Sequence, residues 1–426
     1  MNLYERSLKV LAPVAKRATQ LGVQSGQGSY LIDENGRKIL DFASGVAVCN
    51  IGHNHPKVVE AIHQQVDELI HAGHNVVYYE SYVKLAERLT ELNGPDSMVY
   101  FSNSGAEAND GAIKLAKYVT KRKAIISFKN SFHGRTIGAM SLTASSSAYR
   151  KYYTTLPDIY YLDYPNVYKN PLVDGQLDRH FYDQFTELFN TLVDPYDVAA
   201  IILEPVQGEG GYVVPPKAFL EYVRSVCDEY GILLIFDEVQ TGFGRTGKLF
   251  ASQVFGVEPD IRTVAKGIAS GLPLSAILAK KDLMLQWSPG AHGGTFGGNP
   301  VACAAGLATL DVLLDGAIDN AAKQGEYFKA ELEALKEEFD SIVDVRGVGL
   351  MIGMEIETDG QPDAAKTAQI LKKTLEKGLL LLSCGTAHNV VRFIAPTTVS
   401  ESEIDEAIAI LKSVLTEITA ENKVLN

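Results

Sequence analysis

Short apolar runs alternate with helical patterns between about residues 55 and 300. Pro56 opens a helical pattern whose apolar residues share one face, namely Val59, Ile62, Val66, Leu69 and Ile70. The apolar runs that predict strands lie at 98–101, 124–128, 199–203, 233–236, 261–265 and 275–279. Fully apolar strands alternating with helices are typical of a mainly parallel sheet covered on both faces. The pattern therefore predicts an α/β fold.

The two ends of the chain show a different order of predicted strands and helices. Residues 1–55 predict an N-terminal arm ending in a hairpin around Glu34, Asn35 and Gly36. After about residue 310 a long helical stretch reaches about 340, followed by a strand at 348–356, a helix, short strands at 379–383 and 390–394, and a last helix from about Ser400. We predict an arm (1–55) that joins a small α+β domain (311–426), with a large domain (56–310) between them.

The segment 149–170 is rich in tyrosine and carries no clear period. Its tyrosines are Tyr149, Tyr152, Tyr153, Tyr160, Tyr161, Tyr164 and Tyr168. We expect an irregular loop that covers the surface of the large domain.

Composition narrows the class of protein. With 426 residues, 46% of them hydrophobic and 21% charged, the chain resembles a soluble globular protein. A net charge of −13 argues against a nucleic-acid or anionic-membrane partner. There is no signal-peptide pattern and no apolar run of roughly 18 residues, so we expect a cytoplasmic protein. The separated cysteines, Cys49, Cys227, Cys303 and Cys384, predict free thiols in a reducing compartment.

The stretch from Ser104 to Glu107 is a candidate phosphate cradle. Ser104 suits a helix N-cap and Glu107 lies three residues later, which is a capping-box pattern. Gly105 allows a ligand to approach the backbone, and the amides of a first helical turn favour a bound anion. A helix that is merely well capped would show the same pattern.

Asp237 and Lys266 each follow an apolar strand. A carboxylate at a strand's C-terminal end lies where α/β sheets bind ligands, and there Asp237 could hold a pyridinium nitrogen charged. Lys266, beside small residues, could be desolvated and lose its proton, as Schiff-base chemistry requires. Taken singly, Asp237 could also cap a helix or bind a metal, and Lys266 could be a solvated lysine. No GxxxxGK[ST] motif supports nucleotide hydrolysis.

Two arginines and a glutamate could recognise substrate carboxylates. Arg392 lies inside an apolar strand, so it needs a partner or an anionic ligand. Glu209 on a glycine-rich loop is a plausible partner, and a permanent ion pair is the alternative. Arg135 follows another strand, and the glycine-dense loop 293–300 offers the Thr295 hydroxyl to a phosphate. His53 and His55 lack a third ligand, so we expect loop structure rather than a metal site.

With these residues in view, the chain resembles the class III (omega-amino-acid) pyridoxal-phosphate (PLP) aminotransferases over about 10–415. The motifs that carry the resemblance are NSGAEAN (103–109), FHGRT (132–136), EPVQGEGG (204–211), DEVQTGFGRTG (237–247), AKG (265–267) and GGTFGGNP (293–300). The resemblance implies fold type I, with a mainly parallel seven-stranded sheet in the large domain, and a homodimer whose active sites lie at the interface.

The resemblance also implies roles at the cofactor. Lys266 would form the Schiff base and move the proton, while Asp237 would pair with the pyridine nitrogen. The remaining implied cofactor residues are Phe132 stacked on the ring, Val239 packed against it, Gln240 near the phenolic oxygen, Gly105 and Ala106 at the phosphate, Thr295 at the phosphate from the neighbouring subunit, and His133 and Glu204 in the same site.

Substrate selection is implied to lie outside these residues. In the family, an arginine matching Arg392 binds an α-carboxylate, and a glutamate matching Glu209 neutralises it when the donor is an omega-amine. Arg135 would bind the far carboxylate, and Val46 would lie near the substrate. The run FASGVAVCNIGHNHP (42–56) is shared with 4-aminobutyrate aminotransferases and favours 4-aminobutyrate as donor. The family role of the arginine matching Arg392 implies glutamate or 2-oxoglutarate as the substrate with an α-carboxylate, and so 2-oxoglutarate as acceptor. Phe132 is common in acetylornithine aminotransferases, so acetylornithine, ornithine or another omega-amino acid stays open.

Three other classes compete with this hypothesis. A PLP-dependent epimerase of the same fold would share the motifs. A non-catalytic dinucleotide-binding protein would need a GxGxxG turn, which the chain lacks, and would not need Lys266. A metal-dependent hydrolase built on Asp237, Glu238, His53 and His55 lacks ligand spacing.

Overall fold

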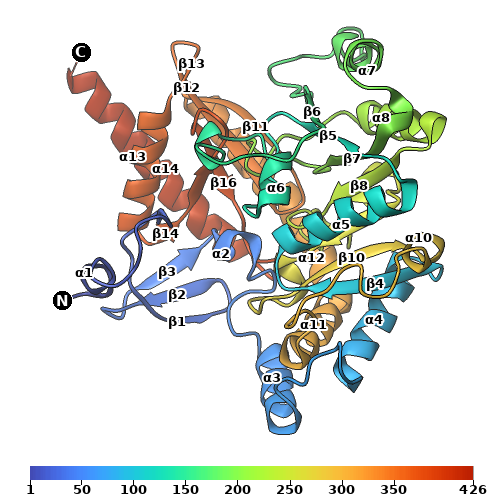
Figure 1. The fold of residues 1–426 in the computed structure, drawn as a ribbon. Helices are drawn as coiled ribbons and strands as arrows, with labels where there is room; N and C mark the ends of the chain where they lie inside the picture. The colour runs from blue at the N-terminus through green and yellow to red at the C-terminus, as the bar shows by residue number, and fades with distance from the viewer. Residues whose placement is uncertain (426) are drawn as a thin grey trace.

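The computed structural model describes residues 1–425 of the chain, which form three β-sheets and their covering helices (Figure 1). The largest sheet has seven strands in the order β4-β10-β9-β8-β7-β5-β6. Their bounds are β4 Ser97–Ser102, β5 Ala124–Phe128, β6 Ile159–Leu162, β7 Val198–Leu203, β8 Leu233–Asp237, β9 Ile261–Val264 and β10 Ser275–Lys280. β10 runs antiparallel to both neighbours, while the pairs from β9 to β6 are parallel. The predicted α/β fold with a mainly parallel seven-stranded sheet is confirmed.

The strand β6 corrects one expectation. It lies within the tyrosine-rich segment, which the sequence predicted to be an irregular covering loop. Ile159 to Leu162 pair in parallel with Ile125 to Phe128 at the edge of the sheet. Tyr160 and Tyr161 are only partly buried there, so this strand lacks the fully apolar signature of the central ones.

Residues on opposite sides of the strands meet different helices. On one face Ile125, Ile235 and Ile277 pack with Ala108 and Ala112 of α5 (Gly105–Thr120). The other face packs against α8 (Lys217–Tyr230), because Phe128, Leu234 and Phe236 share a cluster with Phe219, Leu220 and Val223. Alanines on the buried side of α5 let this helix lie close to the sheet.

The helix α3 (Pro56–Glu68) forms where Pro56 predicted it, but its predicted apolar face is not fully covered. Only Val58 of this helix is fully buried, whereas Val66 and Ile70 are 43% and 60% exposed. Ile70 lies beyond the end of the helix. α3 packs against α11 (Pro300–Val312), and Ile62 reaches the core there, so the exposed part of the predicted face is its C-terminal end.

A second sheet joins the N-terminal arm to the C-terminal part of the chain. It has the order β1-β2-β3-β14, with β1 Val23–Gln27, β2 Tyr30–Asp33, β3 Lys38–Asp41 and β14 Leu379–Leu380. The predicted hairpin is confirmed: β2 and β3 are antiparallel, and Gly36 turns with a φ of 83°. β14 then pairs in parallel with β3.

The third sheet has the order β11-β12-β16-β15, and β13 pairs with β12. The strands are β11 Ile342–Val348, β12 Met351–Thr358, β13 Gln361–Pro362, β15 Leu382–Cys384 and β16 Val390–Phe393. The sequence missed β11, and the predicted strand at 348–356 starts at Met351 because a turn through Gly349 precedes it. The helices α12 Ile318–Glu338, α13 Ala364–Glu376 and α14 Glu401–Leu425 share the core of this sheet (Figure 1). The division into domains stays a prediction.

The other helices are shorter or connect the sheets. They are α1 Leu3–Ser7, α2 Ser44–Ala47, α4 Glu80–Asn93, α6 Ile137–Leu142, α7 His180–Thr191, α9 Ala251–Phe255 and α10 Lys281–Leu285. Short 3-10 turns include Ser147–Tyr149, and all four cysteines are free thiols, as predicted.

By length and composition, one helical stretch of the described residues, Pro300–Glu338, is apolar enough to cross a membrane. This qualifies the expectation that no such stretch exists. Half of its most apolar window is buried inside the protein, and α11 packs against α3 and α4. The backbone is also non-helical at Asp315 and Gly316. The apolar character is therefore explained by packing in the core.

Candidate active site

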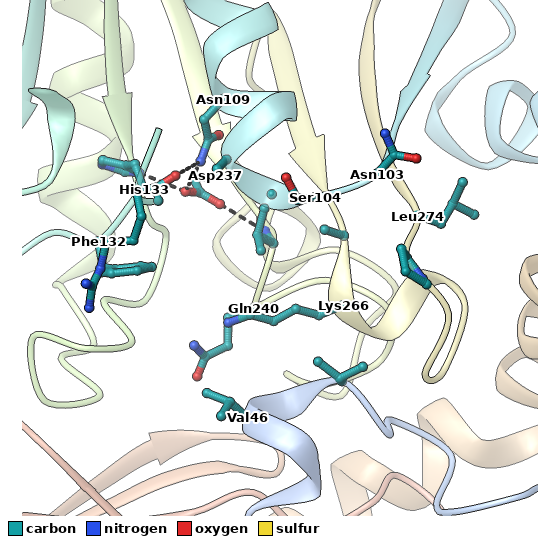
Figure 2. A pocket seen from close by; sticks show the side chains of 18 of the residues that line it. Val46, Asn103, Ser104, Asn109, Phe132, His133, Asp237, Gln240, Lys266 and Leu274 are labelled. Atoms are coloured by element: carbon teal, nitrogen blue, oxygen red, sulfur yellow. Dashed lines mark hydrogen bonds and ion pairs between the residues drawn. The ribbon is translucent and has the colours of Figure 1, made fainter. Parts of the chain in front are cut away.

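A cavity of about 520 Å³ opens at the C-terminal ends of β8 and β9 and at the start of α5 (Figure 2). This is the edge where parallel α/β sheets bind ligands. Twelve of the predicted site residues line it: Val46, Gly105, Ala106, Phe132, His133, Arg135, Glu204, Glu209, Asp237, Val239, Gln240 and Lys266. Arg392 reaches the cavity through its bond to Glu209. Thr295 is exposed and does not line the cavity of its own chain.

Asp237 is held by two buried side chains. Its Oδ2 accepts hydrogen bonds from Nδ2 of Asn109 at 2.8 Å and from Nδ1 of His133 at 2.7 Å, and its Oδ1 accepts one from the amide of Val239 at 3.0 Å (Figure 2). Asn109 is fixed in turn by the Thr263 hydroxyl, which donates to its Oδ1 at 2.7 Å. The carboxylate therefore has one orientation at the wall of the cavity.

The start of α5 presents free backbone amides to the cavity. Ser104 caps the helix by accepting the Glu107 amide at 3.3 Å. The reciprocal half of the predicted capping box is shifted, because Glu107 accepts from the amide of Asn103 at 2.9 Å and from the Ser104 hydroxyl. A Cβ on Gly105 would lie 2.8 Å from Cγ1 of Val239, so only glycine fits this position without rearrangement.

Lys266 lies two positions after the end of β9, lines the cavity and is partly buried, with a left-handed φ of 48°. Such a conformation is strained for a lysine, and strain of this kind gathers at functional sites. Burial lowers the pKa of Lys266, and the nearby positive charge of Arg392 lowers it further, against the opposing effects of Asp237, Glu209 and Glu204. The lysine is therefore biased toward a neutral amine.

Glu209 and Arg392 form an ion pair at 2.7 Å beside the cavity. The side chain of Arg392 is 8% exposed and that of Glu209 is 25% exposed. Burial opposes the charged guanidinium, but Glu209, together with the nearby Cys384 and Tyr212, raises the pKa of Arg392 overall. The loop of Glu209 is anchored too: its carbonyl accepts from the Gly385 amide at 2.9 Å, and Nε of Arg346 donates to the Gly211 carbonyl at 2.9 Å.

Glu204 lines the cavity and holds the backbone of two neighbouring segments. Its carboxylate accepts from the amides of Phe132 and Gly208, each at 2.9 Å. Burial raises the pKa of Glu204, and the neighbouring charge of Asp237 adds to this. On the same side, Oε1 of Gln240 accepts from the Tyr212 hydroxyl at 2.7 Å. Glu204 thus joins the backbone at Phe132 to the backbone at Gly208.

Val46 reaches the cavity from a left-handed turn of the N-terminal arm (Figure 2). Positive φ values run from Ser44 at 45° through Val46 at 63° to Ala47 at 66°, which is unusual for a β-branched residue. Oδ1 of Asp41 holds the turn by accepting the amides of Ala43 and Ser44 at 2.8 and 3.0 Å. His53 pairs with Oδ2 of the same aspartate at 2.8 Å.

Residues 12–415 match the family model described as aminotransferase class-III. The chain belongs to the class III aminotransferases. Among relatives it is 40% identical over 397 residues to the probable 4-aminobutyrate aminotransferase of Bacillus subtilis, covering 91% of each chain. It is 44% identical over 400 residues to the acetylornithine aminotransferase of Caldanaerobacter subterraneus subsp. tengcongensis, covering 92% and 94%. The 5-aminovalerate aminotransferase DavT of Pseudomonas putida is 40% identical over 402 residues, with 93% of each covered.

Solved structures agree with this assignment. An aminotransferase of Bacillus anthracis superposes with a TM-score of 0.91 at 29% identity, covering 97% and 98% of the two chains. An amine transaminase from an uncultivated Pseudomonas species, solved in a PLP-bound form, gives 0.87 at 32% identity, covering 96% and 98%. This class III aminotransferase is therefore a PLP-dependent transaminase of small amino and oxo acids, and the predictions of family, fold and cofactor are confirmed.

Two residues of the aminotransferase site escaped the sequence reasoning. Asn109 is the last residue of the NSGAEAN run, and its place between Ala108 and Ala112 on the buried side of a helix is a signal that its amide needs a partner. Asp41 left no local signal, because its ties to the turn of Val46 depend on the path of the arm.

Proposed function

We propose that this aminotransferase moves the terminal amino group of an omega-amino acid, with 4-aminobutyrate as its preferred donor, to 2-oxoglutarate in a ping-pong reaction. The observation that carries the proposal is the ion pair between Arg392 and Glu209 at 2.7 Å beside Lys266. An arginine with an internal counter-ion can accept either a substrate with an α-carboxylate or one without it. The two half-reactions need both modes of binding, because 4-aminobutyrate has no α-carboxylate and 2-oxoglutarate has one.

The residues of the cavity fit PLP. When bound, this cofactor supplies an electron sink for the carbanion formed at the substrate carbon. Asp237, oriented by Asn109 and His133, is suited to pair with the pyridine nitrogen. The amides of Gly105 and Ala106 at the start of α5 are suited to the phosphate. The absence of a Cβ at Gly105, where one would press on Val239, keeps that cradle open.

Within the cavity Phe132 and Val239 would lie on the two faces of the cofactor ring, and Gln240 would approach its phenolic oxygen. His133 and Glu204 would support the ring from behind. Lys266 would attach the cofactor through Nζ in the resting enzyme. Because burial lowers the pKa of this amine, its Nζ can accept the proton from the reacting carbon of the donor. The same Nζ can then donate this proton two atoms away, which completes a 1,3-proton shift.

Carboxylate recognition would then switch between two ion pairs. An omega-amino donor leaves Arg392 paired with Glu209, while Arg135 takes the far carboxylate. Glutamate or 2-oxoglutarate brings an α-carboxylate that replaces Glu209 on Arg392, again with Arg135 on the far carboxylate. Arg guanidinium groups bind carboxylates through two parallel hydrogen bonds, so both arrangements keep the charge of Arg392 compensated.

The functional unit would be a homodimer in the cytoplasm. Thr295 and Phe296 are exposed, Phe296 by 62%, and Thr295 would reach the phosphate in the neighbouring subunit. Val66 of α3 and Ile70 just beyond this helix are also exposed within the part of the chain that the structure describes. A second subunit on this side would account for both features.

Acetylornithine is the second candidate donor. Phe132 favours acetylornithine, because phenylalanine at this position is common in acetylornithine aminotransferases. The acetylornithine aminotransferase of Caldanaerobacter subterraneus subsp. tengcongensis is also 44% identical to this chain. The deciding experiment is a donor panel of 4-aminobutyrate, acetylornithine, ornithine, 5-aminovalerate, β-alanine and diamines, with glutamate formed from 2-oxoglutarate as the readout. The highest kcat/KM for acetylornithine would replace our choice of donor.

Lys266→Ala tests the chemical role. We expect loss of steady turnover and of the visible absorbance of lysine-bound cofactor, because no other amine is in place to carry the cofactor or the proton. An undiminished absorbance band would contradict the role of Lys266. Incubating an amino acid without any oxo acid separates transamination from racemisation, and racemisation under those conditions would favour an epimerase.

A further inference from the structure

Arg135 is a guanidinium without a carboxylate partner among the residues that the structure describes. It lines the active-site cavity and is exposed to solvent. A long side chain with several rotatable bonds loses substantial rotamer entropy when a ligand fixes it. A binding arginine at an exposed position therefore profits from a contact that holds it in the binding conformation before the ligand arrives.

That contact is an aromatic stack. The Cζ atom of Arg135 lies 3.5 Å from the ring centroid of Tyr149 and 5.7 Å from that of Phe132. The two rings meet edge to face, with centroids 5.8 Å apart at 82°. The cation thus lies over the face of the Tyr149 ring, and the edge-to-face contact with Phe132, which lines the cavity, also holds this ring.

The position of Tyr149 is itself fixed by the segment around it. Its neighbour Arg150 donates from NH2 to the Tyr161 hydroxyl at 2.9 Å, and its guanidinium also lies 4.9 Å from the Tyr161 ring. The Tyr161 hydroxyl donates to the Ser141 carbonyl at the end of α6. Tyr161 belongs to β6, so the tyrosine-rich segment ties the ring of Tyr149 to the edge of the large sheet.

We propose that Tyr149 is a positioning residue for substrate recognition: its ring stacks on Arg135 and preorganises the guanidinium for the far carboxylate of the substrate. This inference rests on the proposed role of Arg135. It assigns a task to the part of the tyrosine-rich segment that precedes β6. Tyr149 does not line the cavity, so its effect is expected to be confined to substrates that carry the far carboxylate.

The test compares two acceptors of equal chain length, 2-oxoglutarate and 2-oxopentanoate, which differ only in the far carboxylate. With the best donor at saturation, Tyr149→Leu is expected to lower the ratio of kcat/KM for 2-oxoglutarate to that for 2-oxopentanoate about fivefold, the size expected for an exposed cation–π contact. The change is expected in KM rather than kcat. Tyr149→Phe keeps the aromatic face and is expected to restore the ratio.

Tyr152→Leu is the matched control. Tyr152 lies in the same segment, is 92% exposed, and has Lys151 4.9 Å from its ring centroid, so this variant removes a cation–π pair that does not touch the cavity. Its ratio is expected to equal that of the wild type. Tyr149→Met, with an unbranched side chain, repeats the test if Tyr149→Leu fails to fold or to hold the cofactor.

Arg135→Gln separates the two levels of the argument. If this variant leaves the ratio unchanged, the proposed role of Arg135 fails, and the role of Tyr149 fails with it. If Arg135→Gln lowers the ratio while Tyr149→Leu and Tyr149→Met do not, the proposed function stands and the inference about Tyr149 is overturned. An equal loss in Tyr149→Phe and Tyr149→Leu would also overturn it, because the hydroxyl rather than the ring face would then matter.

Discussion

Replacing Glu209 by glutamine removes the charge that compensates Arg392 and preserves the shape of the side chain. The pair is joined at 2.7 Å, with Arg392 8% and Glu209 25% exposed. A hydrogen bond between charged groups contributes about 1.5–3 kcal/mol, and the exposure of Glu209 places this pair at the lower end of that range. A free energy of 1.4 kcal/mol corresponds to a factor of ten in rate or affinity. Removing the charge of Glu209 is therefore expected to change kcat/KM about ten- to thirtyfold.

The sign of the effect depends on the substrate. With 4-aminobutyrate, Arg392 has no substrate carboxylate to replace Glu209, so kcat/KM is expected to fall about ten- to thirtyfold. With glutamate, the α-carboxylate no longer competes with Glu209, so kcat/KM is expected to stay constant or rise. The assay follows each half-reaction separately, through the absorbance of the cofactor after mixing enzyme with one amino donor.

Glu258→Gln is the control, because Glu258 pairs with Arg262 at 3.0 Å and its side chain is 67% exposed, away from the cavity. Both half-reactions should proceed as in the wild type. The reasoning about Glu209 would be refuted if Glu209→Gln slowed the reactions with 4-aminobutyrate and with glutamate by the same factor. That result would make the ion pair a permanent structural feature.

Other predictions concern the cradle and the N-terminal arm. Gly105→Ala is expected to weaken PLP binding, measured by absorbance titration, because the new Cβ would lie 2.8 Å from Val239; Val239→Ala in addition should recover part of the affinity, and no recovery would contradict the steric cause. Val46→Gly should exceed Val46→Ala by about 1 kcal/mol in the free energy of unfolding, since only glycine adopts a left-handed φ without cost; equal urea midpoints would refute this. The bond to Asp41 raises the pKa of His53 to about 10. The stability from this pair is therefore complete below about pH 6.5, the value of a free histidine, and is lost as the pH rises toward 10. His53→Gln should flatten that part of the profile of unfolding free energy against pH, and an unchanged slope would disprove the link.

Local patterns predicted the central sheet well because its strands are buried on both faces. Burial makes each strand a continuous apolar run, and the run alone identifies it, as for β7 and β8. β6 escaped because it lies at the edge and carries two half-buried tyrosines, which look the same in a strand and in a loop. The periodicity of α3 predicted an apolar face, but periodicity reports only that a surface is apolar. It does not report what covers that surface.

The candidate site was predictable where a residue's role follows from its own neighbourhood. Asp237 is the last residue of β8, Lys266 lies two positions after β9, and Gly105 follows the N-cap Ser104. A partner for Arg392 was predictable from the sequence, because a charge inside an apolar strand must be compensated. Tyr149 gave no such signal, because its contact with Arg135 depends on how β6 and the turn before it pack against the sheet.

The sequence by itself determined six of the seven strands of the large sheet, the starts of α3 and α5 and the chemistry carried by single residues, since these depend on side chains close in sequence. Only the tertiary structure decided which of these residues meet. Arg392 and Glu209 are 183 positions apart, and Asn109 and Asp237 are 128 apart. Such pairs form because parallel strands bring their C-terminal ends to one edge of the sheet and the third sheet closes over it. The distances and burial that set their charges arise from that packing.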